Sequence, residues 1–233
     1  MSERPGGRRL TMVAAAVALA CLYVVPPSIH ALLASPATPV STPVSATTRT
    51  SRTVDDMHAW ILQGSCTAAV LDTPSGSWLL TATHCATPSS VVAAGRTWTV
   101  LDNVSTRWHL GADGDTLDLS LLRVDGNIEA AVGGGFTVGT APATGEMVSI
   151  WGYPTETGEL TGCDDLPVTV GPAGLVVDAC ELPNGTSGSP WYTPDGVLHG
   201  VVGGPNEGGT SDWDTESTAF TDETVAWIHR VVD

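Results

Sequence analysis

A succession of short β-type runs begins near Val54 and continues almost to the end of the chain, and it constrains the fold more than any other feature. Turn-forming residues cluster between the runs, as in Thr73–Gly76, Asp125–Asn127 and Thr193–Gly196. The runs are Cys66–Leu71, Trp78–Thr81, Trp98–Leu101, Leu117–Val124, Met147–Trp151, Val168–Val170, Leu175–Val177, Val197–Val202 and Ser217–Phe220. Many short strands with no helical period between them predict an all-β barrel or sandwich.

The exception to this pattern lies at the C-terminus. Thr221 can cap a helix whose first turn carries Asp222 and Glu223, where acidic side chains stabilise the helix dipole. The buried stripe of this helix would consist of Val225, Ile228, Val231 and Val232. Glycine (26 residues), proline (16) and a charged fraction of only 15% also suit short strands and turns. We therefore predict an all-β domain that is closed by one C-terminal helix.

The balance of charge limits the partners of the protein. The 233 residues carry a formal net charge of −16, and all nine basic residues are arginine. Phosphate backbones and anionic lipid headgroups repel such an acidic chain, which argues against nucleic acid or an anionic membrane surface as partner. Once an N-terminal segment is set aside, roughly 180 residues remain, enough for one domain or two small ones with a real core.

The N-terminal region differs in composition from the rest of the chain. Arginines precede an apolar run from Leu10 to Val25, so residues 1–34 have the pattern of a signal peptide or a single membrane anchor. Residues 35–53 are nearly all Ser, Thr, Pro, Ala and Val without apolar periodicity, which predicts a linker or propeptide. The folded domain would then span residues 54–233 and lie outside the cytoplasm, whether the first segment is cleaved or retained.

Four of the five cysteines lie in the predicted domain, at positions 66, 85, 163 and 180. An even number of cysteines after an export signal favours two disulfides. A metal site is disfavoured because the sequence has no CxxC pair and no group of Cys and His at ligand spacing.

A histidine stands at the end of one apolar run. The run continues through Leu79-Leu80-Thr81-Ala82 to His84, which is followed directly by Cys85. At a strand end a histidine ring lies near the surface, where it can titrate and transfer protons. If Cys85 pairs with Cys66, the disulfide would hold the His84 loop against the preceding strand. We expect the other histidines, His30, His58, His109 and His229, to be surface or packing residues.

An aspartate stands at the start of another strongly apolar run. Asp118 precedes Leu-Ser-Leu-Leu, which would draw its carboxylate partly into the core. A buried carboxylate needs a donor such as an imidazole N–H. The alternatives are a turn aspartate or a cation site with Asp113 and Asp115.

Residues Gly185–Pro190 read Gly-Thr-Ser-Gly-Ser-Pro, with a serine flanked by small residues and glycines. Glycine permits backbone angles that allow a tight turn to direct its N–H groups inward around the seryl oxygen. The N–H groups of Gly185 and Ser187 could then bind the oxyanion of a tetrahedral intermediate. Glycine- and serine-rich turns are common, so this motif indicates a catalytic serine only in combination with the motifs that contain His84 and Asp118.

The three motifs together resemble the chymotrypsin-fold serine proteases. They are Thr-Ala-x-His-Cys at 81–85, Asp-Leu-Ser-Leu-Leu at 118–122 and Gly-Thr-Ser-Gly-Ser-Pro at 185–190, and the family has the same order of His, Asp and Ser. Trp151–Pro154 and Gly203–Glu207 are similar to the bacterial branch that contains the glutamyl endopeptidases. The resemblance covers essentially the whole of the predicted domain.

This resemblance implies a fold and a mechanism. The fold would be all-β, with two six-stranded β-barrels packed together and a C-terminal helix. Ser187 would be the nucleophile, His84 the general base and Asp118 the residue that orients the imidazole, with the N–H groups of Gly185 and Ser187 as the oxyanion hole. The mechanism requires neither a metal nor an organic cofactor, and the disulfides we predict are Cys66–Cys85 and Cys163–Cys180.

Two positions bear on activation and specificity. Thr186 stands where proteases activated as zymogens carry an aspartate that receives the new N-terminus, so we expect no such switch. The family builds its specificity pocket from the segment before the serine and from a later strand, which points to Glu181, Val202 and Gly203. Glu181 lies six residues before Ser187, the offset of the acidic residue in trypsin-like enzymes. The glutamyl-specific enzymes carry a histidine in the later strand, where this chain has Val201-Val202 and His199 is out of register. Small or apolar substrate side chains are therefore a further alternative.

The leading hypothesis is therefore an exported serine endopeptidase that acts on protein or peptide substrates. We expect it to be monomeric, secreted or extracytoplasmic, with possible attachment to a membrane through residues 1–34. The alternative is a catalytically inactive binding module with the same fold. An esterase on another fold is disfavoured, because those enzymes have the order Ser, Asp, His and a strand–turn–helix around the serine.

Overall fold

The computed structural model describes residues 44–45, 47–48, 54–61, 65–85, 87–109, 117–171, 174–209 and 214–233. The predicted signal peptide or anchor at 1–34 lies outside these residues, as do Asp113 and Asp115. Within the described ranges, none of the helices has the length and apolar character needed to cross a membrane.

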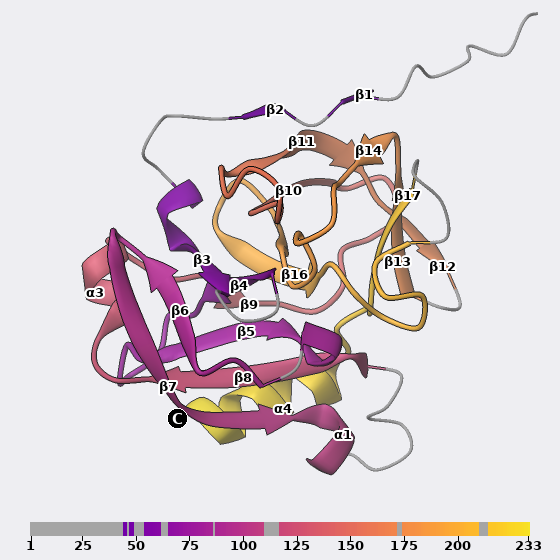
Figure 1. Cartoon of the computed structure of the whole chain (residues 1–233). Helices are drawn as coiled ribbons and strands as arrows, with labels where there is room; N and C mark the ends of the chain where they lie inside the picture. The colour runs from indigo at the N-terminus through magenta and orange to yellow at the C-terminus, as the bar shows by residue number, and fades with distance from the viewer. Residues whose placement is uncertain are drawn as a thin grey trace, which may run out of the picture. The chain divides into compact units, whose positions relative to one another are not determined.

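The first part of the domain is a closed barrel of six antiparallel strands (Figure 1). Its order is β3-β4-β5-β8-β7-β6. The strands are β3 (His58–Ile61), β4 (Cys66–Val70), β5 (Trp78–Ala82), β6 (Ser90–Ala93), β7 (Arg96–Ser105) and β8 (Leu119–Val124). Every residue of β4 and β5 is buried, because both faces of these apolar strands are covered. The barrel thus confirms the strands predicted around His84 and after Asp118.

The second part of the domain consists of more open sheets. A six-stranded sheet has the order β2-β11-β10-β15-β16-β9, and a three-stranded sheet has the order β12-β13-β17. The strands are β2 (Thr47–Thr48), β9 (Thr137–Val138), β10 (Met147–Gly152), β11 (Thr161–Pro167), β12 (Thr169–Gly171), β13 (Gly174–Asp178), β15 (Pro190–Tyr192), β16 (Val197–Val201) and β17 (Asp214–Ser217). The all-β fold class is confirmed, although among the described strands only the first part closes as a single barrel.

Two short strands belong to the stretch for which the sequence predicts a linker or propeptide. β1 (Val44–Ser45) pairs in parallel with β14 (Cys180–Glu181), and β2 pairs antiparallel with β11. Both strands belong to the compact unit Ser41–Asp233. Figure 1 shows both strands running beside β11 and β14. Added edge strands bind through backbone hydrogen bonds, which need no apolar periodicity and leave no signal in the composition.

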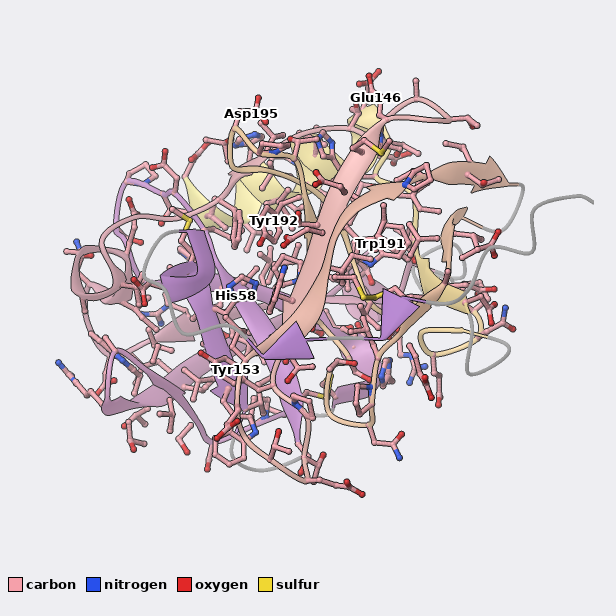
Figure 2. The ribbon with its side chains drawn as sticks, turned by 90° about the horizontal axis from the view of Figure 1, so that it is seen from above. His58, Glu146, Tyr153, Trp191, Tyr192 and Asp195 are labelled. Carbon is pink, nitrogen blue, oxygen red and sulfur yellow. A yellow bond between two sulfur atoms is a disulfide. The ribbon has the colours of Figure 1, made fainter. Side chains whose placement is uncertain are left out.

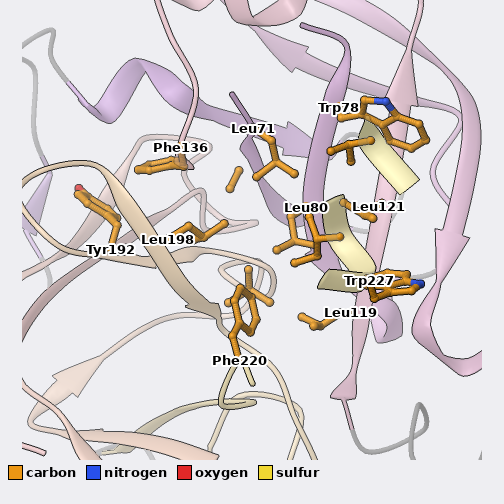
Figure 3. Close-up of a cluster of buried hydrophobic side chains, with 14 of the residues drawn as sticks. Leu71, Trp78, Leu80, Leu119, Leu121, Phe136, Tyr192, Leu198, Phe220 and Trp227 are labelled. Atoms are coloured by element: carbon orange, nitrogen blue, oxygen red, sulfur yellow. The ribbon is translucent and has the colours of Figure 1, made fainter. Parts of the chain in front are cut away.

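The hydrophobic core has three clusters. One lies within the closed barrel and another within the second part, around Ile150 and Trp191. The third joins both parts, because it contains Leu80 and Leu121 from the barrel together with Leu198 and Phe220 from beyond it (Figure 3). This shared cluster fixes the two parts against each other.

The predicted C-terminal helix is present as α4 (Asp222–Val232), and the other described helices are short. They are η1 (Val54–Met57), η2 (Thr83–Cys85), α1 (Thr106–His109) and α3 (Ile128–Val132). The Thr221 side chain accepts a hydrogen bond from the Thr224 N–H at 3.2 Å, which is the expected cap. Trp227 and Ile228 bury the inner face of α4 in the cluster that joins the two parts.

Both predicted disulfides are present, Cys66–Cys85 in the barrel and Cys163–Cys180 in the second part. His58, which was predicted to be a surface or packing residue, is a packing residue. It is 1% exposed, and its ring contacts those of Phe136 and Tyr192 at centroid distances of 5.6 and 5.9 Å. Figure 2 labels His58 and Tyr192, which lie close to each other. The side chain of His109, like the whole of His30, lies outside the described residues.

Candidate active site

His84 lies on η2, which continues directly from β5. Ala82, at the end of β5, pairs with Leu119 at the start of β8, so this ladder brings the residues after β5 beside those before β8. The Thr83 N–H donates to the Asp118 carbonyl at 3.0 Å, and the Thr83 hydroxyl donates to the Leu119 carbonyl at 2.7 Å. Strand pairing and the Cys66–Cys85 disulfide therefore hold His84 from both sides.

Asp118 is almost buried, with 8% exposure, and its carboxylate accepts three hydrogen bonds. Oδ1 accepts from the His84 backbone N–H at 2.9 Å, while Oδ2 accepts from the Gly204 N–H at 2.9 Å and lies 2.7 Å from His84 Nδ1. These donors stabilise the charge of the carboxylate away from water. The bond to Nδ1 favours the neutral tautomer with its proton on that nitrogen, which leaves Nε2 free to act as a base.

The backbone of Asp118 has a φ of +48°, in the left-handed region. Aspartate and asparagine enter this region more readily than most other residues. This conformation ends the preceding segment and begins β8 at Leu119, so the sequence prediction of a strand from Leu117 starts two residues too early.

Opposing influences set the pKa of His84. Burial disfavours the imidazolium and lowers the pKa, but the hydrogen bond and the charge of Asp118, together with the charge of Glu207, outweigh it. The pKa of His84 is therefore raised above its ordinary value of 6.5. The site stabilises a positive charge on the ring, as a general base requires once it has taken a proton.

Ser187 lies on a tight turn before β15 that is docked against the closed barrel. The Thr67 N–H of β4 donates to the Ser187 carbonyl at 2.8 Å, and the Gly188 N–H donates to the Val202 carbonyl at 2.7 Å. Gly188 has a φ of +81°, and a Cβ there would collide with the Thr67 carbonyl and the Thr81 hydroxyl. Glycine is needed at this position both for its conformation and for the close approach.

Among the described residues, the N–H groups of Gly185 and Ser187 have no acceptor. Gly185 has a φ of +101°, and a Cβ there would contact Thr155 and the Tyr153 carbonyl. The Ser187 hydroxyl and the His84 ring make no hydrogen bond to each other in the structure. In free enzymes such bonds are often long, and they shorten when substrate binds.

Thr67 was not singled out by the sequence. Its hydroxyl donates to the Gly185 carbonyl at 3.3 Å and accepts from the Tyr153 N–H at 2.8 Å, while its own N–H binds Ser187. It directly follows Cys66, so one residue of β4 joins the disulfide beside His84 to the serine turn. A lone threonine in an apolar strand gives no local sign of this role, which arises from packing between the two parts.

A cavity of about 210 Å³ opens beside Ser187. Thr186 and Val202 line it, as do two acidic residues, Glu207 and Asp214. Of the other residues predicted for a specificity pocket, Glu181 is exposed and is not part of the lining. Gly203 is not part of it either: a Cβ on Gly203 would meet Asp118 Oδ2 at 2.6 Å, so this glycine makes room for the carboxylate.

Thr186, which stands in place of the aspartate of zymogen-type proteases, is accommodated by hydrogen bonds within its own turn. Its hydroxyl donates to the Pro183 carbonyl at 2.8 Å, and its own carbonyl accepts from the Ser189 N–H at 2.9 Å. The 3% exposed side chain is thus satisfied within its own turn.

One group of side chains within the described ranges has ligand atoms close enough for a metal ion, namely Cys66, His84 and Cys85. The two sulfurs are bonded to each other, so they offer no thiolate. His199, the histidine nearest the cavity strand in sequence, lies 2.6 Å from the Thr140 carbonyl through Nδ1 and does not line the cavity.

Comparison with known proteins bears on the fold. No family model matches this chain. No curated protein matches its sequence. A solved Glu endopeptidase in complex with MPD superposes with a TM-score of 0.67 and 18% identity, over 82% of this chain and 97% of that one. This chain has the chymotrypsin-like serine protease fold.

Two further solved structures with this chymotrypsin-like fold come from a bacterium and from mouse. The protease Anisep of Arthrobacter nicotinovorans has a TM-score of 0.57 and 19% identity, over 75% of this chain and 93% of its own. Neuropsin, a serine protease of mouse brain, has a TM-score of 0.59 and 18% identity, over 77% of this chain and 95% of its own. At this level of identity the match establishes the fold alone, and function has to be argued from the site.

Proposed function

We propose that this chain is a serine endopeptidase that hydrolyses peptide bonds through an acyl-enzyme. The observation that carries the proposal is the 2.7 Å contact between His84 Nδ1 and Asp118 Oδ2, beside a docked serine turn in a chymotrypsin-like fold. An imidazole that is oriented by a carboxylate, and whose cationic form is stabilised, beside a serine on a tight turn is the arrangement that activates a hydroxyl nucleophile.

In acylation, Ser187 Oγ attacks the carbonyl carbon of the substrate while His84 Nε2 accepts the hydroxyl proton. The carbonyl oxygen becomes an oxyanion and binds the N–H groups of Gly185 and Ser187, which have no other acceptor among the described residues. Asp118 stabilises the imidazolium that forms. His84 then gives its proton to the amine as the C–N bond breaks, which leaves an ester on Ser187.

In deacylation, a water molecule replaces the amine. His84 Nε2 accepts a proton from that water as its oxygen attacks the ester carbonyl, and the same N–H groups bind the second oxyanion. Breakage of the ester bond releases the carboxylate product, and His84 returns its proton to Ser187 Oγ. All of the proton transfers use residues of this chain, so the proposed cycle needs no cofactor or metal.

The setting of this activity is part of the proposal. Two disulfides suit a protein that folds outside the reducing cytoplasm. Residues 1–34 would direct export and either leave the chain or tether it to a membrane, and the enzyme would act as a monomer on protein or peptide substrates.

Labelling with a fluorophosphonate tests the proposal, because this probe reacts only with an activated serine. We expect the full chain to be labelled at one site and to release peptides from an unfolded protein substrate. Ser187→Ala should abolish both. The matched control is Ser189→Ala, two residues away: Ser189 is 0% exposed and its hydroxyl makes no hydrogen bond to a described residue, so labelling should persist.

The alternative, an inactive binding module with the same fold, gives the opposite result. A folded chain that takes up no label and cleaves no peptide would support the inactive binding module. Label that survives Ser187→Ala would place the reactive group elsewhere and overturn the assigned nucleophile. Thermal unfolding of each variant, followed by circular dichroism, distinguishes a lost active site from a lost fold.

A further inference from the structure

The cavity beside Ser187 is the place where the side chain of a bound peptide would lie. Its walls come from the serine turn, from the residues after β16 and from β17. At about 210 Å³ it is smaller than the roughly 300–1,000 Å³ of pockets that enclose whole small molecules, so it suits a single side chain.

Two acidic residues, Glu207 and Asp214, line this cavity. Glu207 is fixed by a turn, since its N–H donates to the Gly204 carbonyl at 3.0 Å, and its φ of +54° is left-handed. Its carboxylate has no hydrogen bond or ion pair with any described residue. The charge of Glu207 also acts on His84 and helps to raise its pKa.

The described residues that line the cavity include no arginine, lysine or histidine. The described arginines, Arg96, Arg107, Arg123 and Arg230, are all absent from its lining. A cavity of one charge sign, next to low-dielectric protein, attracts side chains of the opposite sign and repels those of the same sign. Val202 and Leu182 also line it, and they offer apolar surface for the methylene stem of a long cationic side chain.

Of the residues predicted from the sequence for a specificity pocket, Val202 lines this cavity, whereas Glu181 and Gly203 do not. Glu181 is exposed, outside the cavity, and its backbone pairs with Ser45. His199 could have held the carboxylate of a glutamyl substrate, but its Nδ1 lies 2.6 Å from the Thr140 carbonyl and its Nε2 lies 3.2 Å from the Thr193 hydroxyl. An acidic substrate side chain would thus meet two acidic residues and no cation among the described lining residues.

We propose that Glu207 and Asp214 select substrates with arginine or lysine on the N-terminal side of the scissile bond, and that this chain excludes glutamate there. This inference rests on the proposed function, since it assigns the cavity beside Ser187 to the residue whose carbonyl is attacked. It differs from the sequence prediction in the residues that carry the charge.

A matched peptide series tests this proposal with the full chain. The peptides differ only before the scissile bond, where they carry Arg, Lys, Gln, Leu or Glu, and kcat/KM is measured for each. We expect Arg and Lys to exceed Gln by about a hundredfold and Glu to be the poorest substrate. The preference should weaken as salt is raised, since ions screen partly exposed charges.

Variants assign the preference to the cavity. Glu207→Gln should lower kcat/KM for the Arg peptide by about tenfold or more and change the Leu peptide little, and Asp214→Asn should act in the same direction. Glu207→Lys should turn the preference toward the Glu peptide. The matched control is Glu181→Gln, an exposed acid outside the cavity, which should leave the ratio of Arg to Leu unchanged.

Fluorophosphonate labelling distinguishes a failure of the proposed function from a failure of the proposed specificity. An unlabelled, folded chain would overturn the proposed function itself. A labelled chain that prefers Glu or Leu peptides would remain a serine hydrolase but would overturn the assignment of Glu207 and Asp214. A labelled chain whose Arg preference disappears in Glu181→Gln, and persists in Glu207→Gln, would return the role to the residue predicted from sequence.

Discussion

The two parts of the domain support their site residues in different ways. The closed barrel holds His84 and Asp118 through strand pairing, since β5 and β8 are neighbours and β8 begins directly after Asp118. The second part holds Ser187 and the cavity on turns, where glycines at positive φ recur, including Gly185, Gly188, Gly204 and Gly208.

This difference separates two properties of the site. The geometry of base and acid depends on regular hydrogen-bonded strands, which tolerate little change. The serine turn and the cavity walls depend on conformations that only a few residues provide, while the charges on those walls lie partly exposed. We therefore expect substitutions in the barrel to change the rate for all substrates alike, and substitutions in the cavity walls to change the preference among them.

The largest expected effect tests whether the two parts act as one unit. Ser187→Ala and His84→Ala should each lower kcat by about a millionfold, because the nucleophile and its base work together. The double variant should lose no more than either single one. Single-turnover kinetics with an activated ester would measure this, and additive losses in the double variant would show that the residues act separately.

The second-largest expected effect concerns the orientation of the His84 imidazole by Asp118. Asp118→Asn should lower kcat by about 10⁴-fold, because an amide no longer stabilises the imidazolium and favours the wrong tautomer. Asparagine accepts a φ of +48° and keeps the volume, so the fold should persist. The control is Asp102→Asn, an exposed residue of β7 in the same barrel, for which kcat should stay within twofold of the original.

The two disulfides offer a matched comparison of the two parts. They close segments of similar length, with separations of 19 and 17 residues, so removal of either should cost about 3 kcal/mol of unfolding free energy. Replacing Cys66 and Cys85 by serine should lower kcat for every peptide, since His84 adjoins that bridge. Replacing Cys163 and Cys180 should instead change the ratio of Arg to Leu peptides. Equal changes in rate and preference would contradict the division of roles.

The smallest effect is a shift along the pH axis. The pKa of His84 is raised above 6.5, so kcat/KM should decrease as the pH is lowered, and the midpoint of this decrease should lie above pH 6.5. Glu207→Gln should move this fall to lower pH, while Glu181→Gln should not. The imidazolium is favoured in the folded state, so its contribution to stability is complete below the unfolded pKa and is lost as pH rises through the folded one. Urea unfolding across this range would measure it.

Local patterns in the sequence were sufficient to predict much of the fold. The apolar runs predict β5 and β10 to within one residue, and Thr221 predicts the start of α4. The strand β11 was missed because Thr161–Pro167 contains glycine and two aspartates without alternation, and its stability comes from β10 beside it. Likewise, the backbone pairing of β1 and β2 has no compositional signature.

The residues of the candidate site likewise differ in how far local sequence patterns predict them. His84, Asp118 and Ser187 each stand in a distinctive local motif, so their positions could be predicted. Glu207 could not be, because its approach to the cavity depends on a left-handed turn and on β17 beside it. An offset counted along the chain led instead to Glu181, whose neighbours in space are the residues of β1.

The pairing of β1 and β2 has a consequence for the solution behaviour of the protein. These strands cover backbone groups at the margins of β14 and β11, which would otherwise present free N–H and C=O groups to other chains. A cut between Thr48 and Val54 would sever this cover from the rest of the domain. Once it dissociated, the exposed margins could pair with a second copy or with another peptide strand, so a cut at this point should promote association of the protein.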